Sequence, residues 1–186
     1  MIKKIVPGIW KLNVDSNIYF LEDKKIIIDS GPRAYRKDVE MFLSKVVDFD
    51  KVEKVLFTHL HADHIGNFDL FSKAEFFASK EEIESFKKDP VGTVLMEDIA
   101  EKFKKAELKE LKDFGDLKII KTPGHTKGSV CIFYEKERVL FSGDTLFFNK
   151  NIGRTDLPTS AEGEMQNSLN KLAELSFRIL APGHDY

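Results

Sequence analysis

The 186-residue sequence has one cysteine, almost no net charge and no long hydrophobic run. The single cysteine, Cys131, excludes an internal disulfide and is typical of a protein from a reducing cytosol. No run of 18 apolar residues is present, which argues against a membrane-spanning helix. The formal net charge of −2 gives no electrostatic reason to expect nucleic acid as the main partner. We therefore expect neither a nucleic acid nor a membrane among its partners.

The first residues also lack the pattern of an export signal. Lys3 and Lys4 are followed by no apolar run long enough to form the core of a signal peptide. Together with the single cysteine, this favours a cytoplasmic location. Hydrophobic residues make up 42% and charged residues 32%, as in globular proteins that bury a core without disulfides. We expect residues 1–186 to form a single domain.

Short strands and helices follow one another along the chain, with glycines and prolines between them. Apolar and β-branched runs predict strands at 9–14, 17–22, 24–30, 52–60, 74–79, 117–123, 129–135, 138–147 and 177–183. Helical spacing of apolar residues predicts helices that start near Tyr35 and cover 80–88, 93–106 and 161–175. This pattern alone predicts an α/β protein with one core.

All five histidines lie in a few short segments. Three of them, His59, His61 and His64, occur within the seven residues THLHADH at 58–64. The other two, His125 and His184, each follow a glycine. Imidazole nitrogens and carboxylate oxygens are the ligands that zinc and similar metals prefer. A lone histidine is usually a packing or surface residue, but this clustering favours a metal site.

The candidate ligands also share a position, because each follows a predicted strand. A rigid strand followed by an adaptable loop is a natural place for ligands. His59 and His61, two residues apart at the end of a strand, would point to the same face. Asp63 and His64 would follow in the turn and reach a second ion. Asp144 also follows a predicted strand, although its Ser-Gly-Asp-Thr context is equally suited to a turn.

Five short motifs occur in a fixed order along the chain: IDSG at 28–31, THLHADH at 58–64, TPGHTKGS at 122–129, SGDTLF at 142–147 and PGH at 182–184. In content and order they resemble the metallo-β-lactamase superfamily over nearly the whole chain. The resemblance implies a four-layer αββα sandwich, with two metal ions between the upper edges of its two sheets.

The resemblance also implies a role for each candidate ligand. The first ion would be held by His59, His61 and His125. The second ion would be held by Asp63, His64 and His184. Asp144 would bridge the two ions, and Asp29 would orient ligands from outside the cluster. We expect two divalent ions, zinc first, with iron, manganese or nickel as other candidates.

Within the superfamily, residues 143–158 (GDTLFFNKNIGRTDLP) resemble glyoxalase II and its small relatives, which hydrolyse thioesters such as S-lactoylglutathione. The resemblance implies a metal-bound hydroxide that attacks the carbonyl of a small-molecule thioester or ester. Asp63 would bind one metal and orient this hydroxide. Full-length glyoxalase II carries a helical C-terminal domain, whereas this chain ends two residues after His184. Recognition of glutathione therefore stays an open question.

Three other functions compete with this hypothesis. Persulfide dioxygenase-like oxidoreductases share the motif but use one iron, held by residues at the positions of His59, His125 and Asp144. A lactonase acting on cyclic esters, or a non-catalytic metal-binding scaffold, would also use the same residues. The zinc β-lactamases that use a cysteine ligand fit less well, because Cys131 lies in a predicted strand.

The sequence says less about substrate binding. Arg154 is a weak candidate for binding an anionic substrate, and an ion pair with a nearby aspartate is the preferred interpretation. Lys127 is another candidate, for which a solvated turn residue is preferred. The stretch 93–106 could cover the site as a lid or be an ordinary packed helix. The sequence does not indicate an oligomeric state.

Overall fold

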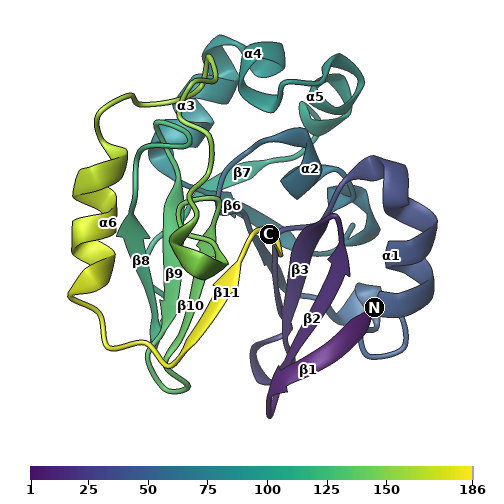
Figure 1. Ribbon diagram of the computed structural model, residues 1–186. Helices are drawn as coiled ribbons and strands as arrows, with labels where there is room; N and C mark the ends of the chain where they lie inside the picture. Colours follow the sequence, from purple (N-terminus) through teal and green to yellow (C-terminus); the bar gives the residue numbers. More distant parts are fainter. Residues whose placement is uncertain (186) are drawn as a thin grey trace.

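The computed structural model describes residues 1–185, which form two face-to-face β-sheets with helices outside them (Figure 1). The larger sheet contains β1 (Ile2–Val6), β2 (Ile9–Val14), β3 (Ser16–Leu21), β4 (Ile26–Ile28), β5 (Lys54–Leu56), β6 (Glu75–Ala78) and β7 (Leu108–Glu110), in that order. The smaller sheet has the order β11 (Ile179–Pro182), β10 (Val139–Gly143), β9 (Val130–Tyr134) and β8 (Leu117–Lys121).

The α-helices are α1 (Arg36–Leu43), α2 (Ala62–Ile65), α3 (Lys80–Lys88), α4 (Pro90–Val94), α5 (Glu97–Phe103) and α6 (Met165–Ala173). Short 3-10 turns are η1 (Glu22–Lys24), η2 (Arg33–Tyr35), η3 (Phe49–Lys51), η4 (Phe68–Leu70) and η5 (Phe148–Lys150). Within residues 1–185, no helix is both long and apolar enough to cross a membrane.

The apolar core consists of three interfaces, one between the two sheets and one between each sheet and the helices outside it. In β4, Ile27 packs toward α1, α3 and α5, whereas Ile26 and Ile28 face the smaller sheet. In β10, Phe141 faces the larger sheet, whereas Leu140 packs toward α6. Side chains of a strand point alternately to its two faces, so each sheet is covered on both sides. Three interfaces between four layers confirm the αββα sandwich, with α1 and α6 on opposite outer faces (Figure 1).

Strand direction brings the candidate ligands to one edge. β4 and β5 are parallel, as are β10 and β11, and β8 runs with β10 because both are antiparallel to β9. The segments that leave the carboxyl ends of these strands therefore meet where the two sheets approach each other. Backbone contacts join the sheets there: Asn17 N donates to Gly183 O at 2.7 Å, and Val130 N donates to Thr58 O at 3.0 Å.

Several predicted boundaries were wrong. The predicted helix 93–106 is divided between α4 and α5, because Leu95 adopts a left-handed conformation (φ 62°) that ends α4. The predicted strand 52–60 shortens to β5, because the chain pairs with β4 and β6 for only three residues before it turns. The strands β1 and β7 were not predicted. The predicted strand 9–14 and the predicted helix 80–88 have the expected ends, as β2 and α3, and the other predicted strands and helices are present with shifted ends.

Candidate metal centre

The segment that carries four of the candidate ligands turns sharply after β5. Since β5 ends at Leu56, His59 and His61 do not lie on a strand, and strand alternation is not what aligns them as predicted. His61 is instead the N-cap of the single-turn helix α2, which carries Asp63 and His64. The rings of His59 and His61 still lie 4.6 Å apart, so the loop aims both side chains at one point.

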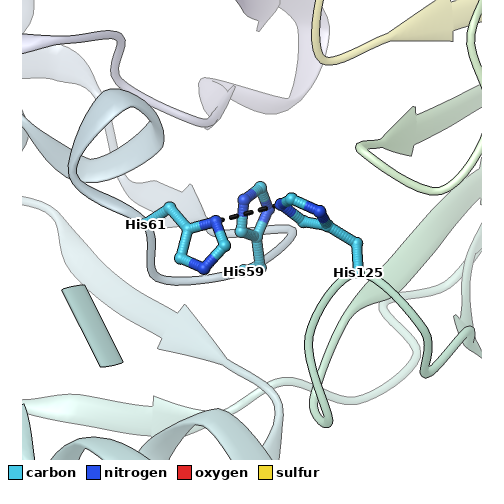
Figure 2. A group of neighbouring side chains, drawn as sticks. All are labelled: His59, His61 and His125. Carbon is cyan, nitrogen blue, oxygen red and sulfur yellow. Dashed lines mark hydrogen bonds between the residues drawn. The ribbon is translucent and has the colours of Figure 1, made fainter. Parts of the chain in front are cut away.

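The fold brings all seven candidate ligands together in three overlapping groups. Within each group, one nitrogen or oxygen of every residue lies within 4.8 Å of the others. The groups are His59, His61 and His125; His59, His64 and Asp144; and Asp63, His64 and His184. Figure 2 shows the first group, with three imidazole rings from two loops directed at a common centre. The first and third groups are the two sets expected from the sequence, and Asp144 lies between them.

Each ring of the first group is held by a hydrogen bond at its outer nitrogen, the one that points away from the common centre. His59 Nδ1 lies 3.1 Å from Thr58 Oγ1, and His125 Nδ1 lies 2.8 Å from the carbonyl oxygen of Arg154. In His61 the outer nitrogen is Nε2, which lies 2.9 Å from Thr159 Oγ1. The inward atoms are therefore Nε2 of His59 and His125 and Nδ1 of His61. Such outer contacts fix ring orientation and tautomer in metal sites.

The second group is anchored in the same way. His64 Nδ1 lies 2.9 Å from Asp29 Oδ2, and His184 Nδ1 lies 3.2 Å from the carbonyl oxygen of Asp15. The inward Nε2 of His184 lies 3.2 Å from Asp63 Oδ2. Carboxylate and imidazole thus face the same point, and the Nδ1 atoms of both imidazoles are bound to the protein.

Asp144 contacts both groups. Its Oδ2 atom lies 3.5 Å from Nε2 of His125 and 3.5 Å from Nε2 of His184. Its Oδ1 atom lies 3.3 Å from Nε2 of His64. A carboxylate in this position would be shared by cations held in the two groups.

Asp29 connects the two groups from outside. Its Oδ1 atom accepts from the backbone N–H of Thr58 at 2.9 Å, and its Oδ2 atom accepts from the Thr58 hydroxyl at 2.8 Å. The same Oδ2 atom faces His64 Nδ1. Asp29 therefore orients His64 directly and His59 through Thr58.

Burial and neighbouring charges set the ionisation of the cluster. Burial lowers the pKa of His59 and His125, and it lowers the pKa of His61 to about 3. Burial opposes ionisation of Asp144, but the neighbouring His64 and His184 outweigh it and hold the Asp144 pKa well below its usual range. Neutral imidazole and ionised carboxylate are the forms that bind metals.

His64 and His184 behave differently, because they lie against the carboxylates. Burial opposes their protonation, but Asp144 and Asp63 outweigh it. The pKa of His64 is raised well above its usual value, and that of His184 is raised to about 9. The pKa of Asp63 is held at about 2 by His64 and His184, against the effect of burial. The carboxylate side of the cluster therefore attracts positive charge.

The chemistry of the inward atoms fits a metal site. His59 Nε2, His64 Nε2 and Asp144 Oδ1 are buried and make no regular hydrogen bond among the described residues, although His64 Nε2 and Asp144 Oδ1 lie 3.3 Å apart as an ion pair. Buried polar atoms in folded proteins almost always have partners, so three such atoms around one point need a ligand. Divalent cations of the zinc type accept both imidazole nitrogen and carboxylate oxygen. The residues present thus fit such ions.

Glu82, on α3, is a supporting residue that sequence analysis missed. Its buried carboxylate accepts from Leu60 N at 2.8 Å, Thr126 Oγ1 at 2.7 Å and Gly128 N at 3.2 Å. Leu60 lies between His59 and His61, and Thr126 follows His125, so Glu82 joins the two loops of the first group. The exposed, charged sequence KEEIESFKK gave no signal that this one carboxylate would be buried.

Gly183 allows the cluster to close. A Cβ atom at this position would lie 2.1 Å from Asp144 Oδ1 and 2.9 Å from His64 Cε1. Any side chain would displace one of these two residues. The glycine before His184 is therefore required by the close approach of β11 to the ligands.

The cluster lies at the floor of a cleft of about 790 Å³. Asp63, whose side chain is 38% exposed, faces this space together with His61, His125, Asp144 and His184. Arg154 lines the cleft too, but it forms an ion pair with Asp156, in which Nε and Oδ1 lie 2.9 Å apart.

Two other segments named in the sequence analysis lie around this cleft. Lys127 is exposed and does not line it. Residues 94–96, at the end of α4 and in the link to α5, form one lip. The following helix is an ordinary packed helix, with Ile99 and Phe103 in the core.

Comparisons with known proteins agree with this geometry. The sequence model of the metallo-beta-lactamase superfamily matches residues 13–184. A probable metallo-hydrolase from Methanocaldococcus jannaschii is 34% identical, over 95% of this chain and 92% of its own. The crystal structure of a metallo-beta-lactamase family protein from Thermus thermophilus superposes with a TM-score of 0.76 at 25% identity, over 98% of this chain and 75% of that one.

A hydroxyacylglutathione hydrolase from Francisella philomiragia is 32% identical over 73% of this chain. The match spans 50% of that enzyme's length. The similarity therefore concerns the half of that protein that corresponds to the fold described above.

Proposed function

Since the chain belongs to the metallo-beta-lactamase superfamily, we propose that it is a metal-dependent hydrolase of thioesters or esters. The observation that carries this proposal is the cluster of seven candidate ligands, with all five histidines anchored, at the floor of an open cleft. The similarity to a hydroxyacylglutathione hydrolase supports the thioester as substrate. The partner would be a small molecule that enters the cleft.

The cluster would hold two divalent ions, zinc first, with iron, manganese or nickel as other candidates. His59, His61 and His125 would hold one ion, Asp63, His64 and His184 the other, and Asp144 would contact both. When bound, such ions supply a water-derived nucleophile near neutral pH and stabilise negative charge that develops on the carbonyl oxygen.

The protein's own residues would bind, orient and shield the reactants. Asp63 stays ionised and faces the cleft, so it can accept a hydrogen bond from the attacking water and direct it at the carbonyl. Val94 and Phe147 line the same space and make part of its wall apolar. Hydrolysis breaks the C–S bond and releases a thiol, which leaves readily as thiolate and needs no strong general acid.

The first test is an assay of S-lactoylglutathione hydrolysis by thiol release, with zinc-loaded protein. We expect hydrolysis, and we expect Asp63→Asn to lower kcat at least about 100-fold, because it removes the carboxylate that would direct the water and help to hold the second ion. Asp50→Asn is the matched control, since Asp50 is an exposed carboxylate in a surface ion pair with Lys73. Equal loss in both variants would contradict the role of Asp63.

The same protein should be offered the substrates of the competing functions. Oxygen uptake with glutathione persulfide, supported by iron and unaffected by His184→Ala, would replace the hydrolase by a mononuclear dioxygenase. Cleavage of lactones without cleavage of any thioester would replace it by a lactonase. Neither outcome would change the fold.

A further inference from the structure

The cleft above the ligand cluster is far larger than a small acyl group needs. Its volume of about 790 Å³ is in the range of cavities that enclose ligands of drug size. The candidate ligands occupy only its floor. The remaining walls therefore determine which substrate fits.

Both lips of the cleft carry exposed hydrophobic side chains. Leu95 and Met96, between α4 and α5, are 42% and 49% exposed. Ile152, after η5, is 44% exposed and also lines the cleft. Figure 1 shows α4 and α5 above the ends of the sheets. Single exposed hydrophobic residues are common, but three around one cleft are typical of a binding surface.

The backbone of Leu95 supports a binding role for this lip. Its φ of 62° is left-handed, and its N–H caps α4 by donating to Val91 O at 2.8 Å. Glycine usually occupies this position of a helix end, because other residues are strained there. Strained backbone of this kind is concentrated at functional sites. The leucine side chain is thus placed at the cleft mouth against the local conformational preference.

Outside the ligand cluster, the charged residues that line the cleft are all of one sign. Apart from the candidate ligands, its charged lining residues are Lys150 and Arg154, both cationic. Arg154 is paired with Asp156, whereas Lys150 is exposed and forms no ion pair within residues 1–185. Lys150 and Asn149 are both left-handed (φ 63° and 56°), and Lys150 lines the same cleft as Ile152.

We propose that the substrate is an amphiphilic thioester, with an apolar acyl chain between the lips at Met96 and Ile152 and an anionic group beside Lys150. This inference rests on the proposed hydrolase function, because it assumes that the scissile carbonyl reaches the ligand cluster. Water adds across the C–S bond, so the products are a medium-chain carboxylic acid and a thiol that bears the anionic group.

The kinetic test compares S-acetyl-, S-butanoyl- and S-octanoylglutathione below micelle-forming concentrations. We expect kcat/KM to be at least about tenfold higher for the octanoyl than for the acetyl thioester, since each buried methylene adds to binding. Met96→Ser and Ile152→Ser should each reduce this ratio about fivefold. Met41→Ser, which changes an equally exposed methionine on α1, should leave it unchanged. Equal rates for the three thioesters would overturn the apolar acyl site and leave the hydrolase intact.

The anionic group is tested with a second thiol. Lys150→Gln should raise KM for S-octanoylglutathione about fivefold and leave KM for the uncharged S-octanoyl-N-acetylcysteamine unchanged. Equal effects on both substrates would overturn the role of Lys150.

A binding measurement separates the acyl site from the catalytic function. S-octylglutathione and S-methylglutathione are thioethers that cannot be hydrolysed, and calorimetry measures their affinity directly. We expect the octyl compound to bind at least about tenfold more tightly, with the difference reduced in Met96→Ser. If no thioester is hydrolysed, the hydrolase proposal fails, and this affinity ratio still decides the apolar site. Equal affinities of the two thioethers would overturn it.

Discussion

The floor and the rim of the cleft are built on different physical principles. At the floor, the candidate ligands other than the half-exposed Asp63 are buried, and histidine nitrogens that point away from the cluster are bound by residues such as Asp29 and Thr159. At the rim, Leu95, Met96 and Ile152 are exposed and lie in connecting segments, the first two between α4 and α5 and the third between η5 and α6. Anchored ligands suit chemistry that requires fixed geometry. Exposed connections can vary without disturbing the core, so they suit substrate selection.

The prediction with the largest expected effect tests whether Glu82 supports the ligand loops at the floor of the cleft. Glu82→Ala leaves three buried donors, on Leu60, Thr126 and Gly128, without their acceptor. We expect the free energy of unfolding to fall by about 4 kcal/mol, measured by urea denaturation of metal-free protein. Glu84→Ala, on the exposed face of α3, should change it by less than about 0.5 kcal/mol. A similar small effect in both variants would show that Glu82 does not support the floor.

A methyl group at Gly183 should damage the metal centre itself. Because a Cβ atom would lie 2.1 Å from Asp144 Oδ1, Gly183→Ala must move Asp144 or the strand β11. We expect zinc affinity, measured by competition with a chelating dye, to fall about 100-fold. Gly163→Ala is the control for backbone strain without a steric clash, because Gly163 has a φ of 85° and a Cβ atom there meets nothing within 4 Å, so its zinc affinity should stay unchanged. Unchanged zinc affinity in Gly183→Ala would contradict the placement of Asp144.

At the rim, the substitution Leu95→Gly should raise the stability of the protein and weaken its preference for long acyl chains. Leu95→Gly relieves a left-handed residue, so we expect the free energy of unfolding to rise by about 1 kcal/mol. The preference for octanoyl over acetyl thioesters should fall in the same variant. Leu95→Ala removes the side chain and keeps the strain, so it should lose the preference without gaining stability. If Leu95→Gly is less stable than the wild type, the leucine is a packing residue and the contrast between floor and rim is weaker.

The smallest effect concerns pH. Burial raises the pKa of Glu82 in the folded protein, so the folded state holds this proton more tightly than the unfolded state does. This contribution to stability is present below the unfolded pKa of about 4.5 and is lost as pH rises through the folded pKa. The unfolding free energy of wild type minus that of Glu82→Gln should therefore decline from pH 4.5 to pH 8. A difference that increases over this range would mean that hydrogen bonds to the carboxylate outweigh burial.

Sequence analysis predicted the floor far better than the rim. The αββα sandwich was implied by five ordered motifs, and all seven candidate ligands converge in the structure. Short motifs are informative here because a ligand cluster needs particular residue types at particular chain positions. The local reason given for His59 and His61 was nevertheless wrong, since a loop and not a strand aligns them.

The remaining features could not be predicted for identifiable reasons. β7 is three residues long and mostly exposed, so it has no alternation to detect. The break at Leu95 occurs in a residue that normally continues a helix. Thr159 and Glu82 reach the ligand loops from 98 and 22 residues away along the chain, so only the folded structure shows their contacts.

The central claim is that these seven side chains hold two divalent ions with Asp144 in contact with both. The most direct measurement is elemental analysis of zinc-reconstituted wild-type and Asp144→Ala protein after exhaustive desalting. We expect close to two zinc ions per chain in the wild type, and at most one weakly held ion in the variant, which loses a carboxylate shared by both groups. Two tightly bound ions in Asp144→Ala, or none in the wild type, would contradict the account.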